Sequence, residues 1–158
     1  MVDAIGRARN QPSVLISTSG AGIYGDRGEE IITESSRGTS VGFLAEVATV
    51  GMQRDEMFKR QVSDTFPVRT ALALGKDGGA IPWIRTVFQF GFEGKLGSGK
   101  QWMPRVHITD IAARFLHALE TESIHGPING ASPIPLRNEA FAKVMGEILR
   151  RPTLFTGA

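Results

Sequence analysis

Hydroxyl side chains and glycines gather in residues 17–25, which read STSGAGIYG and include Tyr24, the single tyrosine of the chain. A hydroxyl can hydrogen-bond the reacting oxygen of a substrate, a phenol can transfer a proton, and glycines let a ligand approach the backbone. The segment follows residues 13–17, an apolar run that predicts a buried strand, and ligands of open α/β sheets bind beyond the carboxyl ends of strands. We therefore predict a ligand site in this segment; the alternative is an ordinary polar turn with a packed tyrosine.

A second glycine cluster, residues 94–100, reads GKLGSGK and fits the GxxxxGK pattern of phosphate-binding P-loops. That pattern requires a hydroxyl residue directly after the lysine and a helix after the loop. Gln101 occupies the hydroxyl position, and Pro104 opposes an immediate long helix. The residues therefore favour a plain turn or a substrate-side loop over the phosphate-binding loop of a nucleoside triphosphatase.

Metal and thiol chemistry finds little support in the residue types. The chain has no cysteine, which excludes disulfides, thiolate nucleophiles and cysteine-ligated metals. The three histidines, His107, His117 and His125, show no metal-ligand spacing, so we expect no metal site. We expect His117 on a helix surface and His125 in a turn. His107 stands where a strand passes into a helix, a place where functional residues concentrate, and is a candidate pocket residue.

Charge and hydropathy exclude two classes of partner. The 18 basic and 16 acidic side chains leave a net charge of +2, and the basic residues are scattered, which does not suit nucleic-acid binding. No apolar stretch approaches the roughly 20 residues of a membrane span, and residues 1–3 do not open a signal peptide. We therefore expect a soluble, cytoplasmic protein that binds neither nucleic acid nor membrane.

Apolar periodicity predicts strands at 13–17, 67–74 and 127–129. It predicts helices at 42–61, at 84–90, after a cap at Thr109 or Asp110, and from a cap at Asn138 to residues 150–152. The side chains expected to face inward in the last two helices are Ile111, Phe115, Ala118, Leu119, Phe141, Val144, Met145, Ile148 and Leu149.

This alternation of strands and helices predicts an α/β fold with a parallel sheet, because such sheets need helices on both faces. Two or three strands would leave apolar faces and open edges exposed. We therefore expect that the chain lacks part of its sheet. Without the missing part, we expect a marginally stable, aggregation-prone protein or an obligate homo-oligomer.

Four segments together resemble, in this order, the extended short-chain dehydrogenase/reductase superfamily. They are VLISTSGAGIYGDRGEE, PVRTALALGKDGGA, GSGKQWMPRVHITDIAARFLHALE and GPINGASPIPLRNEAFAKVMGEILRRP. The combination SxSxxxxYGDRG, GFLAEV, GSGKQWM and HGPINGASP is similar to the atypical subgroup called the NAD-dependent epimerase/dehydratase family, or nucleoside-diphosphate-sugar-epimerase-like proteins. The resemblance extends from about Asp3 to Pro152.

The resemblance implies the carboxyl-side portion of a Rossmann-like parallel sheet and NAD or NADP as the cofactor. It implies that residues 1–158 form a single partial NAD(P)-binding domain. Residues 1–75 would be its sheet portion with the active-site loop, and residues 76–158 would be a substrate-side segment.

Site roles follow from the same resemblance. Ser19, or alternatively Thr18, matches the catalytic hydroxyl that hydrogen-bonds the reacting substrate oxygen, and Tyr24 matches the tyrosine of the active-site loop. The positions that match the cofactor side are Ser17, Thr18, Arg69 and Thr70. The positions that match the substrate side are Gln101, Trp102, Arg105 and His107.

Three departures limit the activity that this chain is expected to have alone. The glycine-rich turn that seats the dinucleotide pyrophosphate would lie upstream of Asp3. The tyrosine and lysine of the family's Tyr-x-x-x-Lys are absent from residues 43–47, which read FLAEV. Arg105 is displaced from the position of a diphosphate-binding Arg-Asp pair.

We therefore expect part of an NAD(P)-dependent epimerase/dehydratase-like oxidoreductase that acts on a hydroxyl or carbonyl substrate and is weak or inactive alone. The alternative is a non-catalytic protein that binds a nucleotide or metabolite, or a truncated pseudoenzyme.

Overall fold

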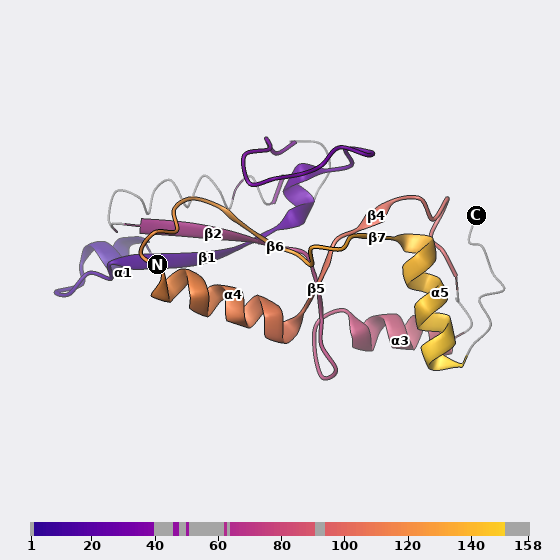
Figure 1. Ribbon diagram of the computed structural model, residues 1–158. Helices are drawn as coiled ribbons and strands as arrows, with labels where there is room; N and C mark the ends of the chain where they lie inside the picture. Colours follow the sequence, from indigo (N-terminus) through magenta and orange to yellow (C-terminus); the bar gives the residue numbers. More distant parts are fainter. Residues whose placement is uncertain are drawn as a thin grey trace. The chain divides into compact units, whose positions relative to one another are not determined.

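The computed structural model describes residues 2–39, 46–47, 50, 62, 64–90 and 94–150 (Figure 1). The chain has an α/β architecture with parallel strands, which confirms the expected fold class. Its contacts divide it into two units: Met1–Ala71 with Thr109–Gly130, and Leu72–Ile108 with Ala131–Ala158. We call these unit 1 and unit 2 and describe each by itself. None of the described helices is long and apolar enough to cross a membrane.

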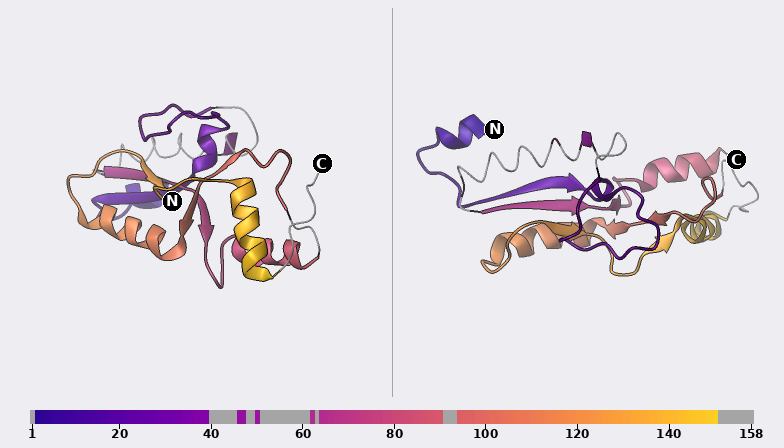
Figure 2. Two further views of the ribbon diagram at one scale, coloured as in Figure 1. Left: turned by 45° about the vertical axis from the view of Figure 1, so that its right-hand side comes forward. Right: turned by 90° about the horizontal axis from the view of Figure 1, so that it is seen from above.

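Unit 1 contains a parallel three-stranded sheet in the order β1-β2-β6 (Figures 1 and 2). Among its described residues, the elements are α1 (Val2–Gly6), β1 (Val14–Gly20), the 3₁₀ helix η1 (Ala21–Tyr24), β2 (Asp64–Thr70), most of α4 (Ile108–Glu120) and β6 (Ile128–Gly130). Val68 of the central strand is fully buried. Since β2 is hydrogen-bonded on both sides, it is the strand around which this unit is organised.

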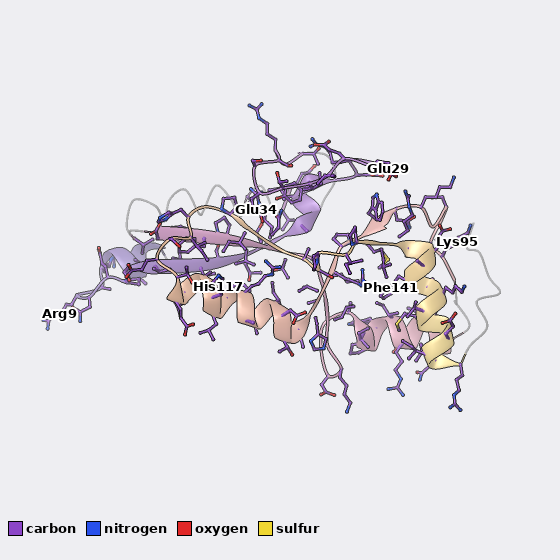
Figure 3. The ribbon with its side chains drawn as sticks, viewed as in Figure 1. Arg9, Glu29, Glu34, Lys95, His117 and Phe141 are labelled. Atoms are coloured by element: carbon purple, nitrogen blue, oxygen red, sulfur yellow. The ribbon has the colours of Figure 1, made fainter. Side chains whose placement is uncertain are left out.

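Helix α4 covers one face of this sheet, and η1 lies on the other (Figures 1 and 3). At the α4 face, a Cβ added to Gly130 would come within 2.5 Å of Ile111 Cδ1 and 3.3 Å of Val68 Cγ1. The glycine therefore lets the helix approach the end of β6 closely. Ile111 and Ala118 are the buried residues of α4.

The described part of unit 2 contains two short strand pairs and two helices. Strands β3 (Leu72–Leu74) and β5 (Arg105–His107) pair in parallel, and β4 (Trp102–Met103) and β7 (Leu136–Arg137) pair antiparallel. Helices α3 (Ile81–Gln89) and α5 (Asn138–Leu149) are in contact. Their buried side chains, Phe88, Phe141, Ala142 and Met145, form the core of this unit. Helix α5 ends at Arg150, which adopts a left-handed conformation with φ of 54°.

The predicted strands exist, but the structure differs from the prediction at the end of the first strand and within the second. Strand β1 continues to Gly20, so Thr18 and Ser19 lie in a strand and not in a loop. The segment 67–74 breaks at Ala71, because the backbone changes partners there. The Ala71 N–H donates to Gly130 O at 3.0 Å, whereas the Leu72 N–H donates to Pro104 O at 3.1 Å.

The helices also differ in detail from the prediction. Helix α3 begins at Ile81, three residues early, with Pro82 in its first turn, where a missing N–H costs nothing. Helix α4 begins directly after β5, at Ile108. Asn138 does not cap α5; it is the first helical residue, and its buried side chain has other partners. The helix predicted at 42–61 lies almost entirely outside the described residues.

Three residues expected to face inward are exposed instead: Leu119, Val144 and Ile148 are 59%, 46% and 69% accessible. Among the other inward positions, Ile111, Ala118, Phe141 and Met145 are buried. The buried stripe of each helix is therefore narrower than its apolar stripe in the sequence.

Gly79 offers a test of unit 2. Its φ is +71°, and a Cβ there would collide with the Ala73 carbonyl oxygen. We expect Gly79→Ala to lower the free energy of unfolding of this unit by about 1–3 kcal/mol, the usual cost of such backbone strain. Urea unfolding followed by the fluorescence of Trp83 and Trp102, both in unit 2, measures it.

Gly78→Ala is the matched control, because a Cβ at Gly78 meets nothing within 4 Å. It should change the free energy of unfolding by less than about 0.5 kcal/mol. Equal unfolding midpoints for the two variants would contradict the assigned conformation of Gly79.

Candidate functional site

Three polar residues form a row across the carboxyl ends of the unit 1 strands. Ser19 of β1 is the register partner of Arg69 of β2, and Arg69 is the partner of Asn129 of β6. Because register partners point to the same face of a sheet, the three side chains share one face. This edge is where ligands of open α/β sheets bind.

Tyr24, at the end of η1, lies on this row. Its side chain is 5% exposed. The phenol oxygen accepts a hydrogen bond from Arg69 Nη1 at 2.5 Å, and the hydroxyl lies 2.6 Å from Asn129 Oδ1 and 3.2 Å from Thr33 O. A phenol has one proton to donate, and the shorter distance assigns it to Asn129. The guanidinium carbon of Arg69 also lies 5.1 Å from the centre of the tyrosine ring.

The loop at residues 25–39 contacts the same face of the sheet through Glu34, which is labelled in Figure 3. The main-chain N–H of Asn129 donates to Glu34 Oε1 at 3.0 Å, and Arg69 Nη1 donates to Glu34 O at 3.1 Å. At the end of the loop, the Thr39 N–H donates to Ile23 O at 2.7 Å. Within it, Arg27 and Glu30 form an ion pair at 2.8 Å. The loop thus has its own internal structure and two polar attachments to the row.

Several buried polar atoms of unit 1 have no hydrogen-bond partner among the described residues: Ser17 Oγ, Ser19 Oγ, Thr65 Oγ1 and Arg69 Nε. Unsatisfied buried polar atoms cost about 1–3 kcal/mol each, so native proteins contain few of them. Ser17, Ser19 and Arg69 belong to the predicted site. Thr18 is exposed, and Thr70 Oγ1 donates to Val68 O at 3.4 Å.

The predicted substrate-side residues lie in unit 2. Gln101 Nε2 donates to Leu96 O at 2.9 Å. Trp102 is 39% exposed, and the guanidinium of Arg137 stacks on its ring at 4.4 Å. Arg105 Nη1 donates to Ile134 O at 3.2 Å.

His107 is the last residue of β5 and is exposed. The structure thus gathers Ser17, Ser19, Tyr24 and Arg69 within unit 1, and it places all four substrate-side candidates within unit 2.

Main-chain N–H groups of the turn at residues 94–100 donate hydrogen bonds within the protein. Asn138 Oδ1 accepts the Leu96 N–H at 2.6 Å, the Gly99 N–H donates to Leu96 O at 3.0 Å, and the Lys100 N–H donates to Ser98 Oγ at 3.2 Å. A P-loop needs such N–H groups free for phosphate oxygens. These contacts support the turn interpretation of the GxxxxGK match.

Glu34 and Asn129 are site residues that sequence reasoning missed. The signal for Asn129 was available, since it is a polar residue ending a predicted strand, as Ser19 and Arg69 are. Glu34 carried no such signal, because it lies in a polar loop and 95 residues separate it from Asn129.

Comparisons with known proteins agree with the resemblance carried by the sequence. No protein-family model matches the chain. An epimerase family protein of Staphylococcus saprophyticus is 31% identical over 144 residues, which are 91% of this chain and 48% of that protein. A human epimerase family protein is 31% identical over 154 residues, which are 96% of this chain and 51% of that protein.

Solved structures give the same result. The human epimerase family protein with NADPH superposes with a TM-score of 0.80 at 28% identity, over 96% of this chain and 51% of that one. A nucleoside-diphosphate sugar epimerase from Corynebacterium glutamicum has a TM-score of 0.79 at 28% identity, over 99% of this chain and 38% of that one. The chain spans about half the length of the curated relatives it matches. By sequence and by fold, the chain matches one part of the epimerase family proteins and has their Rossmann-like architecture.

Proposed function

We propose that the chain supplies the active-site side of an NAD(P)-dependent, epimerase-like oxidoreductase that acts on a hydroxyl- or carbonyl-bearing small molecule. The observation that carries this proposal is Ser19, whose buried hydroxyl has no partner among the described residues and lies at the carboxyl end of a parallel strand. The likeness to a human relative solved with NADPH supports a nicotinamide cofactor.

The residues present fit a cofactor at this edge of the sheet. Ser17 and Arg69 each carry a buried polar atom that lacks a partner among the described residues, and a bound ligand would satisfy both. Together with Thr18 and Thr70, they are the residues that we propose to hold the nicotinamide side. The cofactor, when bound, would accept and return a hydride.

Ser19 and Tyr24 are the proposed catalytic residues. Ser19 would donate its hydroxyl hydrogen to the reacting oxygen of the substrate and so fix that oxygen in place. Tyr24 would exchange a proton with the substrate. Since its hydroxyl already lies 2.6 Å from Asn129 Oδ1, this exchange requires the Asn129 contact to open.

In unit 2, Gln101, Trp102, Arg105 and His107 are the proposed substrate-side residues. The exposed ring of Trp102, with Arg137 stacked on it, suits an apolar or planar part of a substrate. The other N–H groups of the Arg105 guanidinium suit an anionic part of a substrate. Self-association and a cytoplasmic location remain predictions.

A non-catalytic binding protein is the second candidate, and the engagement of Tyr24 favours it. Its hydroxyl contacts Arg69 and Asn129, so the phenol is held within the protein. Such a chain would still bind a nucleotide or metabolite at the unpartnered serines.

Titration with NADPH and NADH separates the two candidates. The fluorescence of Trp83 and Trp102, which are 78% and 39% exposed, reports binding. With a small carbonyl compound added as the hydride acceptor, the absorbance of the reduced nicotinamide reports turnover. We expect weak, saturable binding, with Ser19→Ala reducing turnover more than binding and Ser98→Ala as the matched serine control. A well-folded chain that binds neither dinucleotide contradicts the cofactor proposal, and turnover contradicts the non-catalytic alternative.

Tyr24→Phe tests the attachment of the phenol. We expect a loss of about 1–3 kcal/mol in the free energy of unfolding, because buried Arg69 loses an acceptor and Asn129 loses a donor. Urea unfolding followed by circular dichroism measures it.

Thr121→Val is the control, since it removes a hydroxyl from an exposed contact with His117 and should have little effect. A Tyr24→Phe protein as stable as the Thr121→Val protein would show that the phenol hydroxyl adds no stability.

A further inference from the structure

Arg69 carries a buried positive charge whose partners are neutral. Its side chain is 6% exposed. Its partners are the phenol oxygen of Tyr24, the main-chain oxygen of Glu34 and the face of the tyrosine ring. Among the described residues, no carboxylate lies within ion-pair distance of the guanidinium. Buried charges are normally paired, because removing an ion from water costs several kcal/mol.

The guanidinium also has a donor to spare. Its Nε–H is buried and has no acceptor among the described residues. Ser19 of β1 is the register partner of Arg69, and Ser17 lies two residues earlier in the same strand. Because alternate residues of a strand point to the same face, both unpartnered hydroxyls lie on the face of the sheet that carries Arg69. The Arg69 Nε–H and the hydroxyls of Ser17 and Ser19 therefore lie on one face of the sheet, and none of the three has an acceptor among the described residues.

From this arrangement we infer that Arg69 and Ser17, beside the proposed catalytic Ser19, form a binding site for an oxyanion, a carboxylate or phosphate group. Such a group supplies both the missing negative charge and the acceptor lone pairs, and arginine binds it with strong, charge-assisted hydrogen bonds. The inference rests on the proposed function in one respect, because the anion is then a group of the substrate or of the dinucleotide.

Glu34 controls this site. Its carboxylate holds the Asn129 N–H, beside Arg69 in the row, and its main-chain oxygen occupies Arg69 Nη1. An entering anion meets the negative charge of this carboxylate. Because the donor atoms are buried, an anion reaches them only after a local change in the part of the protein that covers them.

Tyr24 provides the readout, because it is the only tyrosine and its oxygen contacts Arg69 directly. The protein is labelled with ¹³C-tyrosine and titrated with sodium phosphate or sodium acetate, with sodium chloride at matched ionic strength as reference. We expect a saturable shift of the Tyr24 resonance with an oxyanion and none with chloride. Saturation by phosphate alone indicates a phosphate ligand, and saturation by acetate indicates a carboxylate. A resonance that saturates with neither overturns the inference.

Variants locate the site. Arg69→Lys keeps the charge but loses the planar donor fork, and it should weaken oxyanion binding about tenfold. Arg85→Gln, at an exposed position of α3, removes a positive charge elsewhere and should leave binding unchanged. Unaltered binding by Arg69→Lys overturns the assignment to Arg69.

Glu34→Gln keeps an acceptor for the Asn129 N–H but removes the charge, so it should tighten oxyanion binding about threefold or more. Glu122→Gln, at an exposed position beyond α4, is the matched control. Equal affinity in both overturns the role of Glu34, and this arm remains informative where Arg69→Lys does not fold.

These measurements contain no dinucleotide, so the two proposals fail separately. A chain that binds NADPH but neither oxyanion contradicts only the present inference. A chain that binds an oxyanion but no dinucleotide contradicts only the cofactor proposal.

Discussion

The parallel register of β1, β2 and β6 is the constraint on which the candidate site depends. It aligns Ser19, Arg69 and Asn129 as neighbours, although they come from three distant parts of the chain. A shift of one residue in any strand would turn its polar side chain to the face that α4 covers. The apolar residues of the other face, such as fully buried Val68, hold that register, so the core determines where the polar row lies.

Unit 2 uses a single side chain for a comparable purpose. Buried Asn138 accepts the Leu96 N–H and donates to Met103 Sδ at 3.0 Å, while its own N–H donates to Gln101 O at 2.9 Å. One amide thus connects the glycine turn, β4 and the start of α5. The segment that carries Gln101 and Trp102 is therefore held by Asn138 as well as by the pairing of β4 with β7.

Much of the fold was predictable, because each element leaves a local signature. The buried runs around Val14 and Val68 identified β1 and β2, and the periodicity around Phe141 and Met145 identified α5. The site was predictable where it lies at strand ends, as for Ser19 and Arg69. It was not predictable where a contact joins distant segments: nothing local shows that Glu34 meets Asn129 or that Asn138 holds Leu96. The hydroxyl-rich end of β1 was predicted as a loop because serine and glycine favour turns, and pairing with β2 overrides that preference.

The change of hydrogen-bond partners between Ala71 and Leu72 has a consequence for how the protein is made. The chain passes between the units at three points, after residues 71, 108 and 130, so each unit consists of two separate segments. During synthesis, β6 leaves the ribosome only after the first segment of unit 2 has been made. The sheet of unit 1 is therefore completed late, and the core of unit 2 is completed later still, when α5 has been made. A single cleavage at any of the three crossings cannot separate the two units, because at least one of the two fragments then carries parts of both.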